Sequence, residues 1–129
     1  MPGSDEVRLS APATTELPRL ARLTASGLAC RLGFSYDEVE DLRLAIDELC
    51  FSLIGTQGRP GVVHLMFSLD DATLDVEGTL ESGERGPDPL QGGLSRKILE
   101  ALVDEHEVRR NGQDQLTFWM RKRRLPIAG

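Results

Sequence analysis

The sequence is poor in the residue types that build disulfide frameworks and metal clusters. Of its 129 residues, only two are cysteine and two are histidine. Cys30 and Cys50 both fall within helical patterns, so we expect two buried, reduced thiols and no disulfide. His64 and His106 are too isolated in the sequence to form a metal cluster, and each is predicted to be an ordinary strand residue.

Long apolar runs and an excess of positive charge are missing as well. No apolar run is long enough to cross a membrane, and the opening MPGSDEVR does not resemble a signal peptide, which predicts a cytoplasmic protein without membrane contact. The formal net charge of −6 argues against direct binding of nucleic acid. The length and the apolar share of 40% predict one domain over residues 1–129, with an ordered core over about 5–122.

The longest helical pattern runs from Tyr36 to Gly55. Ser35 and Glu38 have the spacing of a capping box, in which each side chain binds the other residue's backbone N–H. Gly55 is a natural end for this helix because glycine readily leaves the helical conformation. Its apolar face repeats at steps of three and four residues and is formed by Val39, Leu42, Ile46, Leu49 and Leu53.

Two groups of residues lie outside that apolar face. Leu44 and Phe51 fall nearly opposite to it, so they either pack against a second buried surface or contact a partner protein. Beside the face runs a flank formed by Asp41, Ala45, Glu48 and Ser52. Glu48 on this flank is either an ordinary solvated helix charge or an acid that points into a cleft.

The remaining patterns predict five strands and two further helices. The strands are expected at 6–10, 62–69, 72–80, 107–110 and 115–122, and the helices at about 15–32 and 94–104. Strands grouped in hairpins with helices between them predict an α+β fold, a two-layer sandwich with helices on one face of a mixed, mainly antiparallel sheet.

Apolar positions within these elements predict which faces are buried. In the second strand of the first hairpin, Leu74, Val76, Gly78 and Leu80 alternate with polar residues and should face the core. The first helix, capped by Thr14 or Thr15, is expected to bury Leu17, Leu20, Ala21, Thr24 and Leu28. The last helix is expected to bury Leu94, Ile98, Ala101 and Leu102. The basic run 121–124 is either a solvated strand end or a contact for an acidic partner.

Three segments together resemble the anti-sigma factor serine kinases, small members of the histidine-kinase-like ATPase superfamily, and especially their actinobacterial branch. DLRLAIDELCFSLI resembles the first ATP-site motif of this family, GGLSRKILEALVDEHEV its glycine loop and following helix, and LTFWMRK its closing strand. The resemblance covers residues 7–122 and implies the histidine-kinase-like ATPase fold.

The resemblance also implies roles for individual residues. Glu48 corresponds to the general base that acts on a target serine, and Ser52 occupies the position of an asparagine that helps to hold Mg²⁺. Serine offers Mg²⁺ a single, shorter hydroxyl in place of an amide carbonyl. Together with Ser52, the residues implied to bind the cofactors ATP and Mg²⁺ are Gly78, Gly92, Gly93, Leu94 and Thr117.

One family feature is missing from the sequence. The aspartate that reads the adenine amino group is absent from residues 78–82, where its motif is expected. Asp75 and Glu77 lie nearby, but the alternation of the strand puts them on the opposite face from Gly78. A site without this carboxylate lacks a hydrogen bond worth about 1.5–3 kcal/mol.

These features leave two main hypotheses about function. In the first, the protein is an anti-sigma regulatory factor that sequesters an alternative sigma factor, yields it to an anti-anti-sigma factor and has a degenerate ATP site. In the second, it is an active ATP-dependent serine kinase that phosphorylates the anti-anti-sigma factor. The resemblance implies that contacts for the sigma factor or for a homodimer lie on the first helix, the outer surface of the central helix and the sheet edge. A third hypothesis is a domain with neither role, because a fold does not fix a function.

Overall fold

The computed structural model describes residues 5–83 and 93–126. The elements follow one another as β1 (Asp5–Pro12), α1 (Leu17–Arg31), α2 (Tyr36–Ile54), β2 (Val62–Asp70), β3 (Thr73–Glu81), α3 (Gly93–Leu102), β4 (Glu105–Arg110) and β5 (Leu116–Arg123). This order of strands and helices confirms the prediction. Gly92 and most of the segment 81–90, predicted to be a loop, lie outside the described residues.

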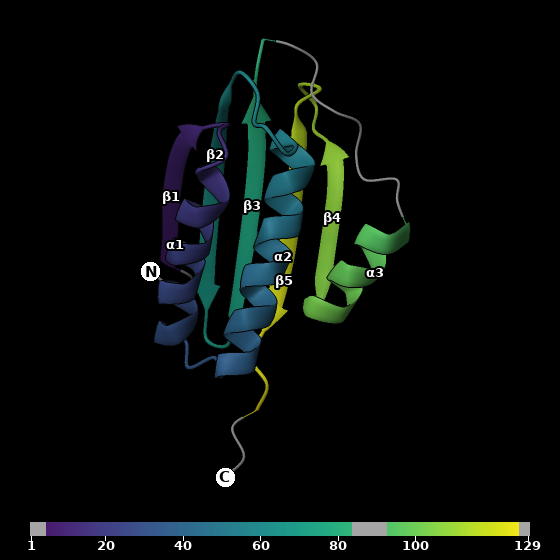
Figure 1. Cartoon of the computed structure of the whole chain (residues 1–129). Coiled ribbons are helices and arrows are strands. Elements are labelled where there is room, and N and C mark those ends of the chain that lie inside the picture. The colour runs from purple at the N-terminus through teal and green to yellow at the C-terminus, as the bar shows by residue number, and fades with distance from the viewer. Residues whose placement is uncertain (1–4, 84–92, 127–129) are drawn as a thin grey trace.

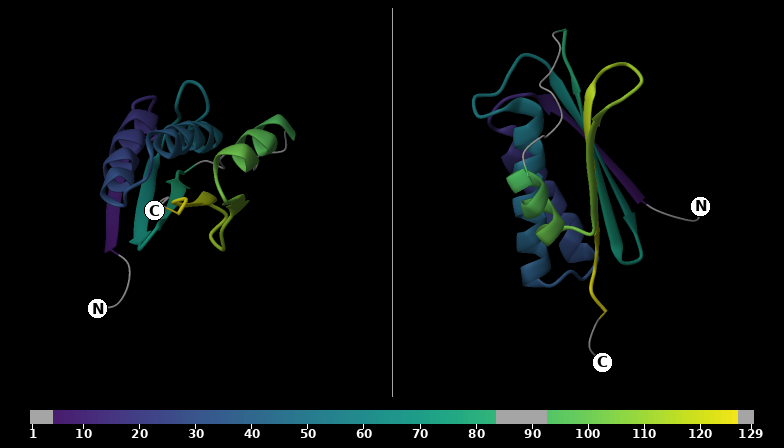
Figure 2. Two further views of the ribbon diagram at one scale, coloured as in Figure 1. Left: turned by 90° about the horizontal axis from the view of Figure 1, so that it is seen from below. Right: turned by 90° about the vertical axis from the view of Figure 1, so that its right-hand side faces the viewer.

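The elements form two layers (Figure 1). The five strands make one sheet in the order β1-β2-β3-β5-β4. All three helices lie on the same side of this sheet, which Figure 2 shows from below and from the side. The predicted two-layer α+β sandwich is therefore confirmed, although each neighbouring pair of described strands is antiparallel and the sheet is not mixed.

The central helix α2 forms as its sequence predicts. The hydroxyl of Ser35 accepts a hydrogen bond from the backbone N–H of Glu38, and the Glu38 carboxylate accepts one from the backbone N–H of Ser35, which completes the capping box. Gly55 ends the helix with φ 73°, a conformation that glycine adopts without strain. Leu42, Ile46, Leu49 and Leu53 are fully buried.

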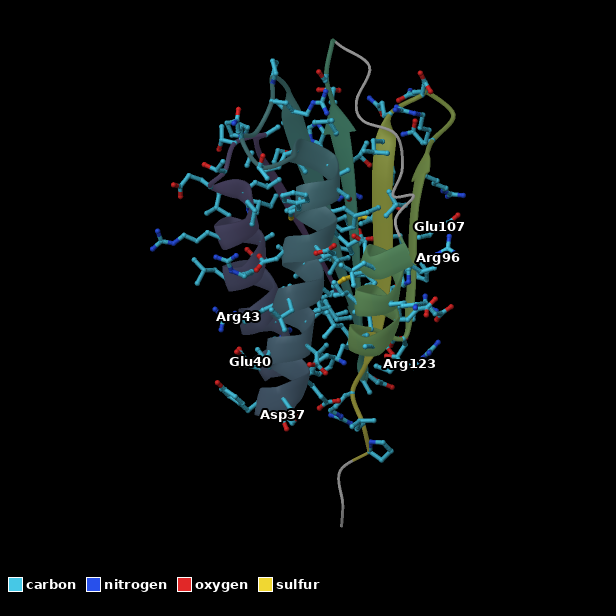
Figure 3. All side chains as sticks on the ribbon, turned by 45° about the vertical axis from the view of Figure 1, so that its right-hand side comes forward. Asp37, Glu40, Arg43, Arg96, Glu107 and Arg123 are labelled. Carbon is cyan, nitrogen blue, oxygen red and sulfur yellow. The ribbon has the colours of Figure 1, made fainter. Side chains whose placement is uncertain are left out.

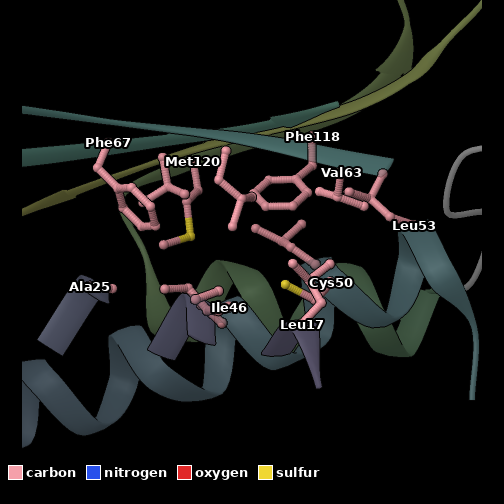
Figure 4. Packing of buried hydrophobic residues seen from close by; sticks show 14 of the residues in the cluster. Leu17, Ala25, Ile46, Cys50, Leu53, Val63, Phe67, Phe118 and Met120 are labelled. Carbon is pink, nitrogen blue, oxygen red and sulfur yellow. The ribbon is translucent and has the colours of Figure 1, made fainter. Parts of the chain in front are cut away.

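The helix-facing side of the sheet supplies the other half of the core (Figure 4). Alternate residues of β2, β3 and β5 are buried there, among them Val63, Phe67, Val76, Phe118 and Met120. Burial of one such side chain contributes about 1.5–3 kcal/mol, so this apolar layer fixes the sheet against α1 and α2.

The predicted faces of the two outer helices are wrong in part. Helix α1 begins at Leu17 without a side-chain cap from Thr14 or Thr15. It buries Leu17 and three alanines at four-residue steps, Ala21, Ala25 and Ala29, whereas Leu20 is exposed. The burial of Ala21 confirms the prediction, whereas Ala25 and Ala29 were not predicted, because a prediction that favours large apolar residues passes over alanine.

Helix α3 departs from its prediction in a similar way. Leu99 and Val103 are buried, whereas Leu94 and Ala101 are exposed. The helix therefore packs through a face rotated from the expected one, which brings Ser95 toward α2.

The thiols differ from each other. Cys30 lies on the outward face of α1 and is exposed. Its predicted burial is therefore wrong. Cys50 is buried as predicted. Burial raises the pKa of the Cys50 thiol to about 12, and the negative charge of Asp47 adds to this effect.

Side chains at the end of β5 bind partners within the chain. Arg121 donates two hydrogen bonds to the carboxylate of Asp75, at 2.8 and 2.9 Å. Lys122 donates to the carbonyl of Leu102 at 2.7 Å. The guanidinium groups of Arg123 and Arg124 bind Glu105 and the carbonyl of Leu32 at 2.8 Å each. These intramolecular partners account for the basic run, which is not simply a solvated strand end.

Candidate functional site

Glu48 lies on the flank of α2 that faces α3. Its side chain is half-buried, and its Oε1 atom accepts a hydrogen bond of 2.6 Å from the hydroxyl of Ser95, in the first turn of α3. The capping box fixes the start of α2, and the buried leucines fix its rotation, so the position of Glu48 follows from local sequence. The contact with Ser95 joins residues 47 positions apart and exists only because α3 packs against α2.

Ser52 lies one helical turn beyond Glu48 and on the same flank. It is buried, and its hydroxyl donates a hydrogen bond of 2.6 Å to the carbonyl of Leu49. The proton of this hydroxyl is thus used within the helix, while its oxygen lone pairs remain available as a ligand.

Gly78 lies in β3, opposite Phe118 of the neighbouring strand. A Cβ atom at Gly78 would come within 2.6 Å of the Phe118 ring and 2.9 Å of Leu65. The missing side chain therefore leaves room for the Phe118 ring in the core. Figure 4 shows this ring within the apolar layer.

Thr117 precedes Phe118 in β5 and so points to the other face of the sheet. Its hydroxyl lies 3.2 Å from the hydroxyl of Thr79, on the face that the helices leave open. The structure thus brings Glu48 and Ser52 together and places Thr117 on the opposite side of the sheet.

The predicted glycine loop is described only in part. Gly93 is the first residue of α3, and the side chain of the following Leu94 is exposed to solvent. Ser95, which comes next and meets Glu48, was not singled out by the sequence analysis. Its place two residues after a glycine pair, at a predicted helix start, is the signal that could have found it.

The resemblance implies a nucleotide site with a phosphate end and an adenine end. The described residues fit the phosphate end better than the adenine end. A serine hydroxyl fits against Glu48, as Ser95 demonstrates. Where the resemblance implies the adenine ring, the helix-facing residues of β2 and β3 are all apolar or glycine, and Asp75 lies on the opposite face, bound to Arg121. Within residues 5–83 and 93–126, no three His, Cys, Asp or Glu side chains cluster closely enough to hold a metal ion.

A second feature is the outer surface of α1 and α2, which faces away from the sheet. A groove of about 330 Å³ lies there and is lined by Thr15, Pro18, Arg22, Asp47, Phe51, Ile54, Gly55 and Thr56. An ion pair between Arg22 and Asp47 links the two helices. Large apolar side chains stay exposed on these helices, with Leu23 at 64%, Leu44 at 56% and Phe51 at 49%. The interpretation of Leu44 and Phe51 as core residues is therefore wrong.

Charged side chains lie on the same two helices as these apolar residues, in the pairs Arg22–Asp47 and Arg43–Glu40. Figure 3 shows Asp37, Glu40 and Arg43 along the lower part of α2, where Arg43 donates a hydrogen bond of 2.9 Å to Glu40. On the other side of the molecule, Arg96 of α3 and Glu107 of β4 line a separate hollow. The apolar surface of α1 and α2 is thus bordered by charge.

Comparison with known proteins identifies the family. The chain is 31% identical over 129 residues to the serine-protein kinase RsbW of Bacillus pumilus, an alignment that covers 83% of this chain and 80% of that protein. The chain belongs to the serine-protein kinase RsbW family. The RsbW of Bacillus subtilis is 32% identical over 125 residues and is covered to 78%, and that of Oceanobacillus iheyensis is 29% identical over 142 residues and is covered to 89%. No family model matches the chain.

The fold of this RsbW-family protein also matches a solved structure. The RsbU and RsbW domains of Rv1364c from Mycobacterium tuberculosis superpose with a TM-score of 0.68 at 19% identity, over 96% of this chain and 34% of that one. This likeness supports the RsbW-like α+β fold alone. Among the described helices, none combines the length and the apolar character that a membrane span requires.

Proposed function

We propose that this RsbW-family protein is a cytoplasmic anti-sigma regulatory factor of the actinobacterial type, with a degenerate ATP site. It binds and sequesters an alternative sigma factor and yields it to an anti-anti-sigma factor. The observation that carries this proposal is the exposed apolar surface of Leu23, Leu44 and Phe51 on α1 and α2. Large apolar side chains bordered by charge are typical of surfaces that bind another protein.

The composition of the sheet supports the degenerate ATP site. A nucleotide would find no carboxylate for its adenine ring on the helix-facing side of β3, where Phe118 packs against Gly78. The retained base, Glu48, and the hydroxyl of Ser52 would remain at the phosphate end, together with the backbone of Gly93 and Leu94. Binding of a sigma factor does not require the adenine end, because it uses a different surface.

Variants on the outer surface of α1 and α2 test the binding function. Phe51→Ala and Leu44→Ala should each weaken a sigma-factor complex, because buried apolar anchors at the centre of an interface contribute about 2 kcal/mol or more, or roughly 30-fold in affinity. Leu125→Ala is a matched control, since Leu125 is also exposed but lies beyond β5. Calorimetry with each alternative sigma factor of the source organism measures the affinities, and gel filtration of the protein alone should show a homodimer.

The binding function is rejected if none of these sigma factors forms a complex, with or without nucleotide. If Leu125→Ala and Phe51→Ala weakened the affinity for the sigma factor equally, the binding surface would not lie on α1 and α2. Thermal unfolding of each variant shows whether it is still folded, and so whether a weaker complex reflects the loss of a contact or the loss of the fold.

A second candidate function is an active serine kinase that acts on the anti-anti-sigma factor. The hydroxyl of Ser95 at 2.6 Å from Glu48 favours it, since a general base must lie within about 2.6–3.2 Å of the proton that it takes. Titration with Mg-ATP in a calorimeter tests this function. If Mg-ATP binds and either Glu48→Ala or Ser52→Ala abolishes this binding, the kinase function is supported. If no heat of binding is measured, only the sigma-factor binding function remains.

A further inference from the structure

We propose that the free edge of β4 pairs with the β4 edge of a second copy of this chain, so that two five-stranded sheets join into one. This inference rests on the homodimer expected under the proposed function and names its interface. It does not depend on the binding of a sigma factor or of a nucleotide.

Strand β4 lies at one edge of the sheet (Figure 1). Among the described strands it pairs with β5 only. Two hollows of about 410 Å³ each lie along this edge, between α3 and β4 and beside Trp119. The described residues therefore leave room beside β4, where a further strand would lie about 4.8 Å away.

The turn between β4 and β5 shows which backbone groups of β4 are left without a strand partner. The backbone N–H of Asn111 donates a hydrogen bond of 2.9 Å to the carbonyl of Gln115. Hydrogen-bonded pairs recur at every second residue of an antiparallel ladder, so residues 107 and 109 direct their backbone groups toward β5. The residues of β4 whose backbone N–H and C=O groups point outward are 106, 108 and 110.

The side chains of β4 carry opposite charges on either side of Val108. On the open face of the sheet, Glu107 is 53% and Arg109 is 65% exposed. A twofold axis through Val108, perpendicular to the sheet, places Glu107 of each copy directly opposite Arg109 of the other. Opposite charges in facing positions stabilise an antiparallel strand pair. The edge of β4 is thus complementary to itself.

The same axis suits the backbone and the helix-facing side. It sets the outward backbone groups of residue 106 opposite those of residue 110, and those of Val108 opposite their own copy. Val108 is partly buried against the core, so its contact with the second Val108 extends the apolar layer across the junction. All helices of both copies lie on one side of the joined sheet, and the exposed surface of α1 and α2 stays free to bind another protein.

The other edge of the sheet, β1, is less suited to such pairing, although residues 6–8 have the same Glu-Val-Arg order. The backbone N–H of Ala13 donates to the carbonyl of Gly61 at 3.0 Å, so alternation directs the backbone groups of Val7 toward β2 and not outward. An axis through Val7 therefore lacks the central hydrogen-bonded pair that β4 supplies. Pro12, at the end of this edge, has no N–H to donate.

Analytical ultracentrifugation of the full chain tests the pairing. Short strands bury little area, so we expect a weak dimer that forms as the protein concentration rises from about 1 µM to about 1 mM. Added salt should weaken association, because the paired charges are near the surface. Glu107→Arg and Arg109→Glu should each raise the dissociation constant by about 10-fold or more, because like charges then face each other twice across the axis.

Matched controls come from the other edge of the sheet. Glu6→Arg and Arg8→Glu make the same charge reversals in the same local sequence of β1 and should leave the dissociation constant unchanged. Because all four substitutions are at exposed positions, each variant should remain folded, which circular dichroism verifies.

An equal mixture of the Glu107→Arg and Arg109→Glu proteins is the sharpest measurement. In a mixed dimer, each position 107 again faces a position 109 of opposite charge, so the mixture should associate about as well as the unaltered protein. Val108→Pro provides a test that does not depend on charge. It removes an outward N–H that the monomer does not need, and should therefore prevent dimerisation while the strand still forms.

The outcomes separate this inference from the function on which it rests. A chain that stays monomeric at every concentration rejects this interface and the expected homodimer, while complex formation with a sigma factor remains a separate result. A dimer that the β4 variants leave intact, or that the β1 variants disrupt, rejects the β4 interface but keeps the homodimer. Species larger than a dimer would indicate pairing of β4 with β1, which also contradicts the proposed symmetry.

Discussion

The backbone N–H of Leu125 donates a hydrogen bond of 2.6 Å to the carboxylate of Glu38. This contact joins the segment after β5 to the first turn of α2, across 87 positions in the sequence. Glu38 also accepts from the backbone of Ser35 and is only 6% exposed. Burial by itself raises the pKa of Glu38, but the hydrogen bonds from Ser35 and Leu125 and the charge of Lys122 outweigh burial and lower the pKa below its usual value.

Replacement of Glu38 should therefore destabilise the protein in a pH-dependent way. Glu38→Gln weakens hydrogen bonds to a buried charged group, so we expect a loss of about 1.5–3 kcal/mol in the free energy of unfolding at neutral pH. Because the pKa of Glu38 in the folded protein lies below its usual value of 4.5, this stabilisation is complete above pH 4.5 and is lost as the pH falls through the pKa of the folded state.

Urea unfolding of the unaltered protein and of the Glu38→Gln variant, from neutral pH to below pH 4.5, measures the difference in their free energies of unfolding. Glu40→Gln serves as the control, because Glu40 lies on the same helix but only pairs with Arg43 at the surface. Its effect should stay within about 0.5 kcal/mol. A Glu38→Gln effect that is equally large at low pH would contradict the assigned role.

Two glycines should respond to alanine in opposite directions. Gly78→Ala places a Cβ 2.6 Å from the Phe118 ring, so we expect a destabilisation of about 1–3 kcal/mol from overpacking. Gly27→Ala in α1 meets no atom within 4 Å and should stabilise the protein by about 0.5–1 kcal/mol through helix propensity. Adding Phe118→Leu to Gly78→Ala should recover part of the loss, because the smaller side chain leaves space. Purely additive effects in this double mutant would argue against the close packing.

The two thiols should react at very different rates. Cys30 is exposed, whereas the raised pKa of Cys50, about 12, leaves a thiolate fraction on the order of 10⁻⁵ at neutral pH. A thiol reagent should therefore label one cysteine rapidly, and Cys30→Ser should remove this fast phase. Unfolding in urea should make both cysteines reactive, and fast labelling of native Cys50 would disprove its burial.

The end of α3 should loosen when Lys122 is replaced. The Lys122 ammonium donates to the Leu102 carbonyl and lies 3.7 Å from Asp41, so it links β5 with α3 and α2. Lys122→Met should lower the free energy of unfolding by about 1–3 kcal/mol because the carbonyl loses its partner. Hydrogen exchange should accelerate at the end of α3, and Lys97→Met on the exposed face of the same helix should leave it unchanged.

Much of the fold could be predicted because its signals are local. The capping box of Ser35 and Glu38, the helical repeat from Val39 to Leu53 and the alternation in β3 depend on residues a few positions apart, and all three appear in the structure. The grouping of strands into hairpins then fixes the two-layer architecture. The alternation in β3 also correctly put Asp75 on the face opposite to Gly78.

The candidate site was less predictable, because its contacts join distant segments. The prediction favoured large apolar residues at helical spacing, so it included Leu20 but not Ala25 or Ala29. In the last helix it chose the face of Leu94 and not that of Leu99, and it left Phe51 undecided. The alternation of β5 predicts that Thr117 and Phe118 point to opposite faces of the sheet. That Thr117 is separated from Glu48 followed only from the structure, in which all described helices cover the face of Phe118.

The sequence by itself determined the helices, the strands and their order, because backbone preference and apolar spacing act over a few residues. Only the tertiary structure decided that Ser95 meets Glu48, that Leu125 binds Glu38, and that Leu44 and Phe51 remain exposed. These relationships depend on how whole helices rotate and pack against one another, and no short stretch of the chain specifies that rotation.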